Sequence, residues 1–333
     1  MKRFASLVFA TATMIASLVI PLTVSAAAAV KAPSATTNNQ SFQISPPTST
    51  YAADPGTTVK GVIKVNNLTN AALSLTVGKE NFVAKGEEGE IELTDNADPL
   101  YSLAPWFNAA VTQITVPPLG TTSFNYTIAV PANAEPGGRY GSITFNTIAP
   151  KLAGGESGAA VQQQLAAIIF LRINGPANES LKIDSFATGT RASNGNFTAK
   201  SFFEYAPVDF LTRVQNTGTV HEKPTGTITI KNMFGFTTAT IPLDEHYVIP
   251  GAIRALHNVY PTSNQKKLMF GRYTAHINAT YANGKTLSAD VSFTVIPYKL
   301  LVIIFVVLLI VFIVFWRGRK RLARAGRILA GKE

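Results

Sequence analysis

The sequence predicts an all-β protein with two tandem β-sandwiches, a signal peptide before them and one transmembrane helix after them. Short runs such as Thr58–Val65 alternate apolar and polar residues, which is typical of strands with one buried face. The stretch PGGRYGSITF at 136–145 returns in altered form as FGRYTAHINA at 270–279, which indicates that one folding unit is used twice. The uncharged run LLVIIFVVLLIVFIVFW at 300–316 is long enough to cross a bilayer as a helix.

The N-terminal end has the three parts of a secretory signal. Lys2 and Arg3 precede the apolar run Phe4–Val24, and Val24–Ala26 supplies small residues for cleavage. We therefore predict a signal peptide at 1–26, with an uncleaved anchor as the alternative. Residues 27–40 are rich in Ala, Thr and Asn, and are predicted to be a flexible leader.

The C-terminal end predicts the topology. Tyr298 and Trp316 lie at the two edges of the predicted helix 298–316, where aromatic rings favour the headgroup region. The tail 317–333 holds seven Lys and Arg, and positive charge beside a span stays in the cytoplasm. The sequence thus predicts a single-pass protein of the cell membrane, with its N-terminal part outside and the lipid bilayer as a partner.

Charge and cysteine content exclude some classes. The net charge is +10, but the excess sits in the signal, the membrane edge and the tail, so the predicted ectodomain is nearly neutral. A basic surface for nucleic acid is not expected. The chain has no cysteine, so the exported part must fold through core burial without disulfides.

The first sandwich is predicted at 41–175. Alternating runs at Thr58–Val65, Leu73–Val77 and Ser123–Val130 are its clearest strands, and Val161–Ile173 is the predicted closing strand. Residues 79–110 are predicted to be an insertion that the second copy lacks.

The second sandwich is predicted at 178–297, after a joint at 174–176. Pro117 precedes Tyr140 by 23 residues, and Pro250 precedes Tyr273 by the same interval. Upstream, the segment Lys-Val-Asn-Asn at 64–67 matches Arg-Val-Gln-Asn at 213–216. Matching landmarks at equal spacing indicate an internal repeat.

The repeated Gly-Arg-Tyr phrase has a structural explanation. In immunoglobulin-like sandwiches, a Tyr near the start of the penultimate strand bonds back to the preceding corner, and glycine lets the chain turn there. Arg139 and Arg272 are expected on the solvent face, because side chains alternate along a strand. The residues assigned this structural role are Gly138, Tyr140, Gly271 and Tyr273.

No catalytic or metal-binding motif is evident. The histidines lack ligand spacing, and the Gly-rich loop 153–158 lacks the Lys and the helix of a phosphate loop. The acidic segment 87–98 lacks regular calcium-ligand spacing and is predicted to be a solvated hairpin. We expect no enzyme, no cofactor and no metal. The histidines are His221, His246, His257 and His276.

One aromatic pair is a candidate binding feature. Trp106 and Phe107 lie in the predicted insertion, and such a pair on a loop can anchor a partner. The same pair can instead plug the end of a sandwich, which is the more common fate of large aromatic residues.

Several of these segments resemble the bacterial WxL-interacting proteins. The resemblance implies a cell-surface complex, with a first domain that binds peptidoglycan, a second that contacts outside or host proteins, and WxL-domain proteins as partners. The second domain here is short and lacks the insertions expected for host contact. The segments that carry the resemblance are 41–47, 55–56, 105–107, 136–141, 216–226 and 271–273, together with the C-terminal helix and its basic tail.

Two functions follow from these observations. The leading prediction is a membrane-anchored, non-enzymatic scaffold that attaches to peptidoglycan, to a WxL-type surface protein, or to both. The alternative is a membrane-bound export accessory or chaperone that captures secreted chains by strand addition. An enzyme would need a polar cluster assembled from distant loops.

Overall fold

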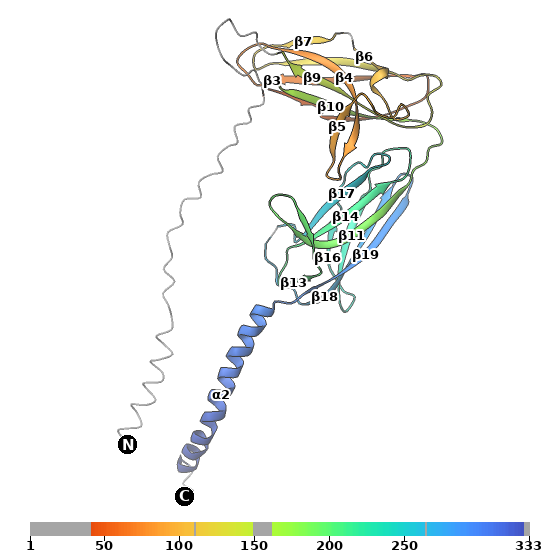
Figure 1. The fold of residues 1–333 in the computed structure, drawn as a ribbon. Coiled ribbons are helices and arrows are strands. Elements are labelled where there is room, and N and C mark those ends of the chain that lie inside the picture. Colours follow the sequence, from red (N-terminus) through yellow and green to blue (C-terminus); the bar gives the residue numbers. More distant parts are fainter. Residues whose placement is uncertain (1–40, 110, 149–161, 264, 330–333) are drawn as a thin grey trace. The chain divides into compact units, whose positions relative to one another are not determined.

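The computed structural model describes residues 41–109, 111–148, 162–263 and 265–329 (Figure 1). The predicted signal peptide and leader, and the Gly-rich loop 153–158, lie outside the described residues. The described chain is mostly β, with one long apolar helix at its C-terminal end. The all-β prediction is confirmed in this coarse form.

The N-terminal half, residues 41–176, forms two sheets. The first has the order β1 (Phe42–Ser45), β3 (Thr58–Asn67), β8 (Thr121–Ala129), β6 (Phe107–Ala109). The second has the order β2 (Thr48–Ala53), β10 (Gln164–Ile173), β9 (Gly137–Thr147), β4 (Leu73–Lys85), β5 (Glu90–Thr94), and β7 (Gln113–Val116) also pairs with β4. Burial alternates along β3 and β8, as their sequences predict, so their apolar side chains form a core with the second sheet.

The C-terminal half, residues 177–297, also forms two sheets. The first has the order β12 (Phe197–Ala199), β11 (Leu181–Arg191), β14 (Val208–Asn216), β17 (Ile253–Tyr260). The second has the order β13 (Phe202–Phe203), β19 (Lys285–Val295), β18 (Gly271–Tyr281), β15 (Thr225–Asn232), β16 (Thr237–Pro242). A second core lies within this half, where the rings of Phe210 and Phe293 meet edge to face with 5.8 Å between centroids.

The described part of the predicted insertion 79–110, residues 79–109, has a defined structure. It extends β4 to Lys85, returns as β5, and continues through the short 3₁₀ helix η1 (Ala104–Trp106) into β6. The joint at 174–176 falls between β10 and β11. The described residues belong to one compact unit, so the division into two immunoglobulin-like domains stays a prediction.

A buried asparagine closes the end of β3 in the N-terminal half. The side-chain Nδ2 of Asn67 donates to the carbonyl oxygens of Ala71, Val116 and Pro117 at 2.7, 3.2 and 3.0 Å. Its Oδ1 accepts from the backbone N–H of Thr69 at 2.9 Å. One side chain therefore satisfies backbone groups from two loops that are distant in sequence.

Asn216 makes the same arrangement at the end of β14 in the C-terminal half. Its Nδ2 donates to the carbonyl oxygens of Val220 and Val248, each at 2.7 Å, and its Oδ1 accepts from the N–H of Gly218 at 2.8 Å. Both asparagines thus bind the N–H two residues ahead and the carbonyl four residues ahead. The aligned segments 64–67 and 213–216 therefore end in asparagines that make matching hydrogen bonds.

The C-terminal helix α2 spans Tyr298–Leu329. Its segment Tyr298–Arg319 has a mean hydropathy of 3.2 and is long and apolar enough to cross a membrane. Strand β19 ends at Val295, so only Ile296 and Pro297 separate it from the helix. The orientation of the helix across a membrane stays a prediction.

We predict that Asn67→Ala lowers the free energy of unfolding by about 3 kcal/mol, because it leaves buried carbonyl groups without donors. Asn66→Ala is the matched control, since this half-buried neighbour makes one side-chain bond, from Thr121 Oγ1 at 3.2 Å. Its cost should stay below about 1 kcal/mol. Guanidinium unfolding of the detergent-solubilised full chain measures both, and equal losses would contradict the proposed importance of Asn67.

Candidate functional site

The hairpin between β4 and β5 binds the C-terminal half with its tip. Arg213 Nε donates to Glu87 Oε2 at 2.7 Å, and its Nη2 bonds the other oxygen of the same carboxylate. The N–H of Ala255 in β17 donates to the carbonyl oxygen of Glu87 at 2.8 Å. The hydrogen bond from Arg213 lowers the pKa of the Glu87 carboxyl group. A solvated hairpin was predicted here; Glu88 and Glu90 are exposed, but the tip residue Glu87 also binds the C-terminal half, which the sequence did not predict.

The neighbouring carboxylate extends this contact. Glu88 Oε1 lies 2.9 Å from His257 Nε2, and Glu88 Oε2 lies 3.4 Å from Arg191 Nη2. Two acids of the hairpin therefore face two arginines and a histidine of the C-terminal half. This charge complementarity fixes where the hairpin binds.

An aromatic cluster forms a second contact between the halves. Phe82, Tyr140 and Phe170 of the N-terminal half pack together, with Phe82 and Phe170 edge to face at 5.7 Å between centroids. His221 of the C-terminal half lies against Tyr140 at 5.6 Å, and Tyr247 stacks on Phe170 at 5.3 Å. These rings bury the His221 side chain.

Three charged side chains lie near His221. Glu222 is buried and its Oε1 lies 3.9 Å from Arg172 Nη1, while Arg172 also pairs with Glu179. Burial and the neighbouring Glu179 raise the pKa of Glu222. Burial, and secondarily the positive charge of Arg172, lower the pKa of His221 to about 4. The imidazole is therefore neutral near pH 7.

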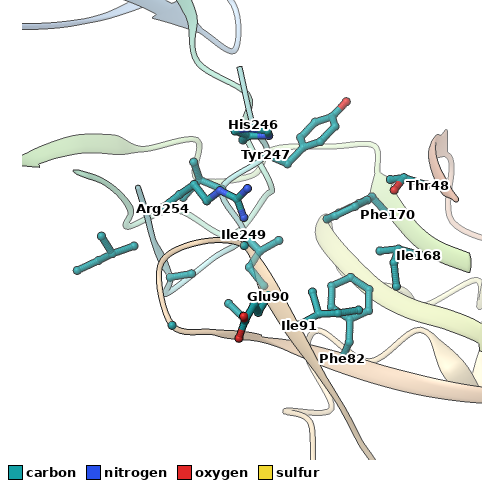
Figure 2. Close-up of a pocket in the computed structure, with 16 residues that line it drawn as sticks. Thr48, Phe82, Glu90, Ile91, Ile168, Phe170, His246, Tyr247, Ile249 and Arg254 are labelled. Carbon is teal, nitrogen blue, oxygen red and sulfur yellow. The ribbon is translucent and has the colours of Figure 1, made fainter. Parts of the chain in front are cut away.

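A cavity of about 270 Å³ lies beside this cluster. Figure 2 shows the rings of Phe82 and Phe170 on one side of it and the guanidinium of Arg254 across from them. Burial lowers the pKa of Arg254. The cavity is slightly smaller than the usual range for small-molecule sites, and its lining brings together no pair of nucleophile and base. Among the described residues, no group of three His, Asp or Glu is placed to hold a metal.

The repeated Gly-Arg-Tyr phrases differ in structure. Tyr273 donates from its hydroxyl to the carbonyl oxygen of Phe270 at 3.2 Å, which is the bond back to the corner that the sequence predicts. Tyr140 instead joins the aromatic cluster, and no bond to its own corner is found in the described residues. A Cβ atom at Gly138 would lie 2.0 Å from the Tyr140 hydroxyl oxygen, so this glycine makes room for the tyrosine.

The two arginines differ as well. Arg272 is exposed, as predicted, but Arg139 is 4% exposed, so its predicted place on the solvent face is wrong. Arg139 Nη1 donates to the carbonyl oxygen of Gly138 at 3.0 Å, and its guanidinium lies over the ring of Trp106 at 5.4 Å. The physical reason is that the two faces are exchanged relative to the prediction. Arg139 lies on the same face of β9 as Ile143 and Phe145 of the core, next to Trp106, while Tyr140 takes the outer face with Phe82 and Phe170.

The aromatic pair of the insertion is mostly internal. Phe107 is 2% exposed and meets Tyr126 edge to face at 5.9 Å, so it forms part of the core and is not available to a partner. Its predicted binding role is therefore wrong, and the plug alternative describes its place. Trp106 is half-buried beneath Arg139. A binding role for Trp106 stays a prediction.

The last strands of the two halves are covered to different extents. In the N-terminal half, β2 runs parallel to β10 and pairs with it along Ile168–Ile173. In the C-terminal half, β13 is the matching strand, but it pairs with β19 only at Thr294 and Val295. The segment Lys285–Ser292 of β19 therefore has a strand on one side only, among the described residues.

The open side of β19 presents unpaired backbone groups. Thr294 donates its N–H outward, to the carbonyl oxygen of Ser201 at 2.8 Å. Backbone groups alternate in direction along an antiparallel pair, so every second residue before Thr294 also faces outward. These residues are Thr286, Ser288, Asp290 and Ser292. No backbone partner on this side is found for them within the described chain.

An apolar seam lies beside this open edge. Strand β11 of the other sheet contacts β19 and pairs with β12 only at Gly189–Arg191. Most of its outer edge therefore has no strand beside it in the part of the chain that the structure describes. Half-buried apolar side chains from both strands pack against the core there. They are Ile183 and Phe186 of β11, and Ala289 and Val291 of β19.

Strand β17, the outer strand of the other sheet, is already occupied. Its Ala255 N–H bonds the hairpin tip, and its His257 N–H donates to Asp244 Oδ2 at 3.4 Å. The open edge of β19 with its seam, hereafter the β19 edge, is therefore the candidate binding site. Sequence reasoning did not find it, because the sequence of β19 does not show whether another strand covers it.

Comparisons with known proteins give a fold likeness and no family. No family model matches the chain, and no curated protein matches it. A chain of a chaperone–tip adhesin complex of CFA/I fimbriae biogenesis is 12% identical, covers 75% of this chain and 97% of its own length, and has a TM-score of 0.38. A chain of the Salmonella enterica SafA pilin complex with the SafB chaperone is 11% identical, with coverages of 77% and 96% and a TM-score of 0.35.

A third structure is the CsuC–CsuE chaperone–tip adhesion subunit pre-assembly complex of Acinetobacter baumannii. It is 10% identical, covers 69% of this chain and 98% of its own, and has a TM-score of 0.33. The titles of these structures name pilus chaperones in complex with their subunits, and none names peptidoglycan or a WxL-type protein. The leading prediction of a scaffold for peptidoglycan or a WxL-type surface protein is therefore not kept. The resemblance to the WxL-interacting proteins stays a prediction.

We predict that acid weakens the chain through His221. The pKa of this imidazole is about 4 in the folded chain, against its ordinary value of 6.5. Its titration therefore costs no stability above pH 6.5 and lowers the free energy of unfolding progressively as the pH falls to 4. The full loss of unfolding free energy from His221 is about 3 kcal/mol. The raised pKa of Glu222 opposes part of this loss, because the folded chain binds a proton at Glu222 more readily than the unfolded chain does.

The comparison variant is His221→Phe, which keeps a ring in the cluster and removes the titration. Between pH 7 and pH 4 the unmodified chain should lose about 3 kcal/mol more unfolding free energy than the variant. Denaturant unfolding at a series of pH values measures the difference. Parallel pH profiles would show that His221 is not the group responsible.

Proposed function

We propose that this protein captures secreted chains by strand addition at the β19 edge. The observation that carries the proposal is the row of backbone groups along Lys285–Ser292 that have no backbone partner among the described residues, next to an apolar seam. An extended segment that lies along β19 gains main-chain hydrogen bonds at every second residue. Its alternate side chains then face the seam and leave water.

The chemistry of the β19 edge determines which chains can bind there. Backbone pairing does not read side chains, so the β19 edge accepts many sequences that are extended and not yet folded. The seam adds a preference for apolar side chains at alternate positions. A chain in transit before folding or assembly offers both features, whereas a folded partner has already paired its strands.

The edge also carries a feature that limits self-association. Asp290 lies on β19 and is exposed, and its Oδ1 lies 2.8 Å from His276 Nδ1 on β18. A charged side chain in the middle of an open strand opposes pairing between identical edges. The β19 edge is thus open to other chains and disfavours pairing with a second copy of itself.

The proposed setting is a cell membrane. Helix α2 spans the bilayer and the two halves, each an immunoglobulin-like sandwich, lie outside, with the basic tail 317–333 in the cytoplasm. The short connection between β19 and α2 holds the β19 edge close to the membrane from which secreted chains emerge. The activity involves no catalytic step.

We predict that Ser288→Pro weakens capture about tenfold, while Ser288→Ala does not. Proline removes the outward N–H and fills the edge with its ring, but it leaves the bonds between β19 and β18 intact. The variant loses one backbone hydrogen bond to the captured segment, and the proline ring keeps that segment away from the strand. Together these losses cost about 1.4 kcal/mol of binding free energy, which is a tenfold change in affinity. Reduced, carboxymethylated α-lactalbumin, which stays unfolded, is the probe for the full chain in detergent.

Hydrogen exchange locates the contact. Amides of Lys285–Ser292 should exchange more slowly when the unfolded probe is bound, and those of Ile168–Ile173 in β10, which β2 covers, should not change. The proposal fails if Ser288→Pro binds the probe as tightly as Ser288→Ala. It also fails if the protection lies away from β19 and β11.

A further inference from the structure

Large apolar side chains are exposed in three segments of the C-terminal half. The turn between β15 and β16 carries Met233, Phe234 and Phe236, which are 52, 75 and 70% exposed. The segment before β18 carries Leu268 and Phe270, which are 62 and 60% exposed. The third segment is β13, where Phe202 is exposed. Exposed rings at this density are unusual for a turn in water.

The strand register places these three segments at one end of the sheet. Asn232 at the end of β15 is opposite Tyr273 at the start of β18. Gly271, the first residue of β18, is opposite Val295 at the end of β19. Phe202 is opposite Thr294. The exposed residues therefore flank the end at which β19 leaves the sheet.

The aromatic turn has a fixed conformation. Asn232 Oδ1 accepts from the N–H of both Phe234 and Phe236 at 3.0 Å, and the N–H of Asn232 donates to the carbonyl oxygen of Phe236 at 2.9 Å. Gly235 has φ +83°, a conformation that favours glycine. The backbone is satisfied within the turn, so the two rings are held outward.

The same glycine that opens β18 accommodates this turn. A Cβ atom at Gly271 would lie 2.0 Å from the terminal methyl group of Met233, and Gly271 has φ +106°. Met233 thus lies across the start of β18, next to exposed Phe270. The turn and the segment before β18 form one apolar surface, which we call the apolar end: Phe202, Met233, Phe234, Phe236, Leu268 and Phe270.

The apolar end lies next to the start of the apolar helix. Three residue steps separate Val295 from Tyr298, and these reach at most about 11 Å. Exposed basic side chains, Lys231 and Arg272, directly adjoin the turn and the start of β18. Lys299, the second residue of α2, pairs through its Nζ with Glu204 Oε2 at 2.9 Å. Aromatic and basic side chains beside a span are typical of the membrane interface.

We propose that the apolar end inserts into the headgroup and acyl boundary of the bilayer that α2 spans. Phe234 and Phe236 enter the apolar side of this boundary, and the basic residues meet lipid phosphates. The lipid surface is the occupant because the chain itself enters the membrane a few residues away. The inference rests on α2 as a span and does not depend on strand capture.

Spin labels in the full chain test this insertion. The chain has no cysteine, so one introduced Cys is a unique site for a nitroxide label. Phe234→Cys labels the apolar end, and Asn283→Cys labels the turn between β18 and β19, at the opposite end of the same sheet. Leu308→Cys, within α2, reports whether the helix spans. Each variant is reconstituted in vesicles of phosphatidylcholine and phosphatidylglycerol.

Collision rates with oxygen, which partitions into lipid, and with a nickel chelate, which stays in water, give the depth of each label. We expect labels at 308 and 234 to collide mainly with oxygen, and the label at 283 to collide mainly with nickel. If 308 reports lipid and 234 matches 283, the insertion is wrong. Low collision with both reagents at 234 means that protein covers the surface, which also overturns it. If the label at 308 collides mainly with nickel, α2 does not span the bilayer, and the proposed insertion is overturned with it.

Discussion

One buried asparagine organises the contact between the two halves. Asn216 holds the carbonyl groups of Val220 and Val248, and these residues directly precede and follow the rings that face the N-terminal half, His221 and Tyr247. The same loop offers the carbonyl oxygen of Thr219 to the N–H of Gly138 at 2.8 Å. In a chain without disulfides, this one polar side chain therefore positions the aromatic cluster and also satisfies the backbone at the end of β14.

Much of the fold follows from local patterns in the sequence. Alternation predicts β3 and β8, because each has one face in the core and one in water. The equal spacing of landmarks predicts the repeat, and the uncharged run predicts α2. The same reasoning fails at Arg139, which shares the inner face of β9 with Ile143 and Phe145, while Tyr140 takes the outer face. Alternation assigns a side chain to a face, but it does not tell what lies over that face.

The candidate site depends on contacts that local patterns do not encode. Whether a strand is open depends on its neighbours, which come from distant segments: β2 lies more than a hundred residues before the β10 that it covers. The acidic hairpin is similar, since its charge pattern predicts solvation until Arg213 and His257 are placed opposite it. One local signal for the open edge is that β13 is short: the run of strand-like residues stops after Phe203, so β13 can cover only the end of β19.

The direct passage from β19 into α2 has a mechanical consequence. A segment paired along β19 lies parallel to the axis of the strand that continues into the helix. A pull on that segment along the strand loads all of its hydrogen bonds together in shear, whereas a pull across the strand breaks them one at a time. The direction of pulling, and not only the number of bonds, then decides whether a held chain is kept or let go.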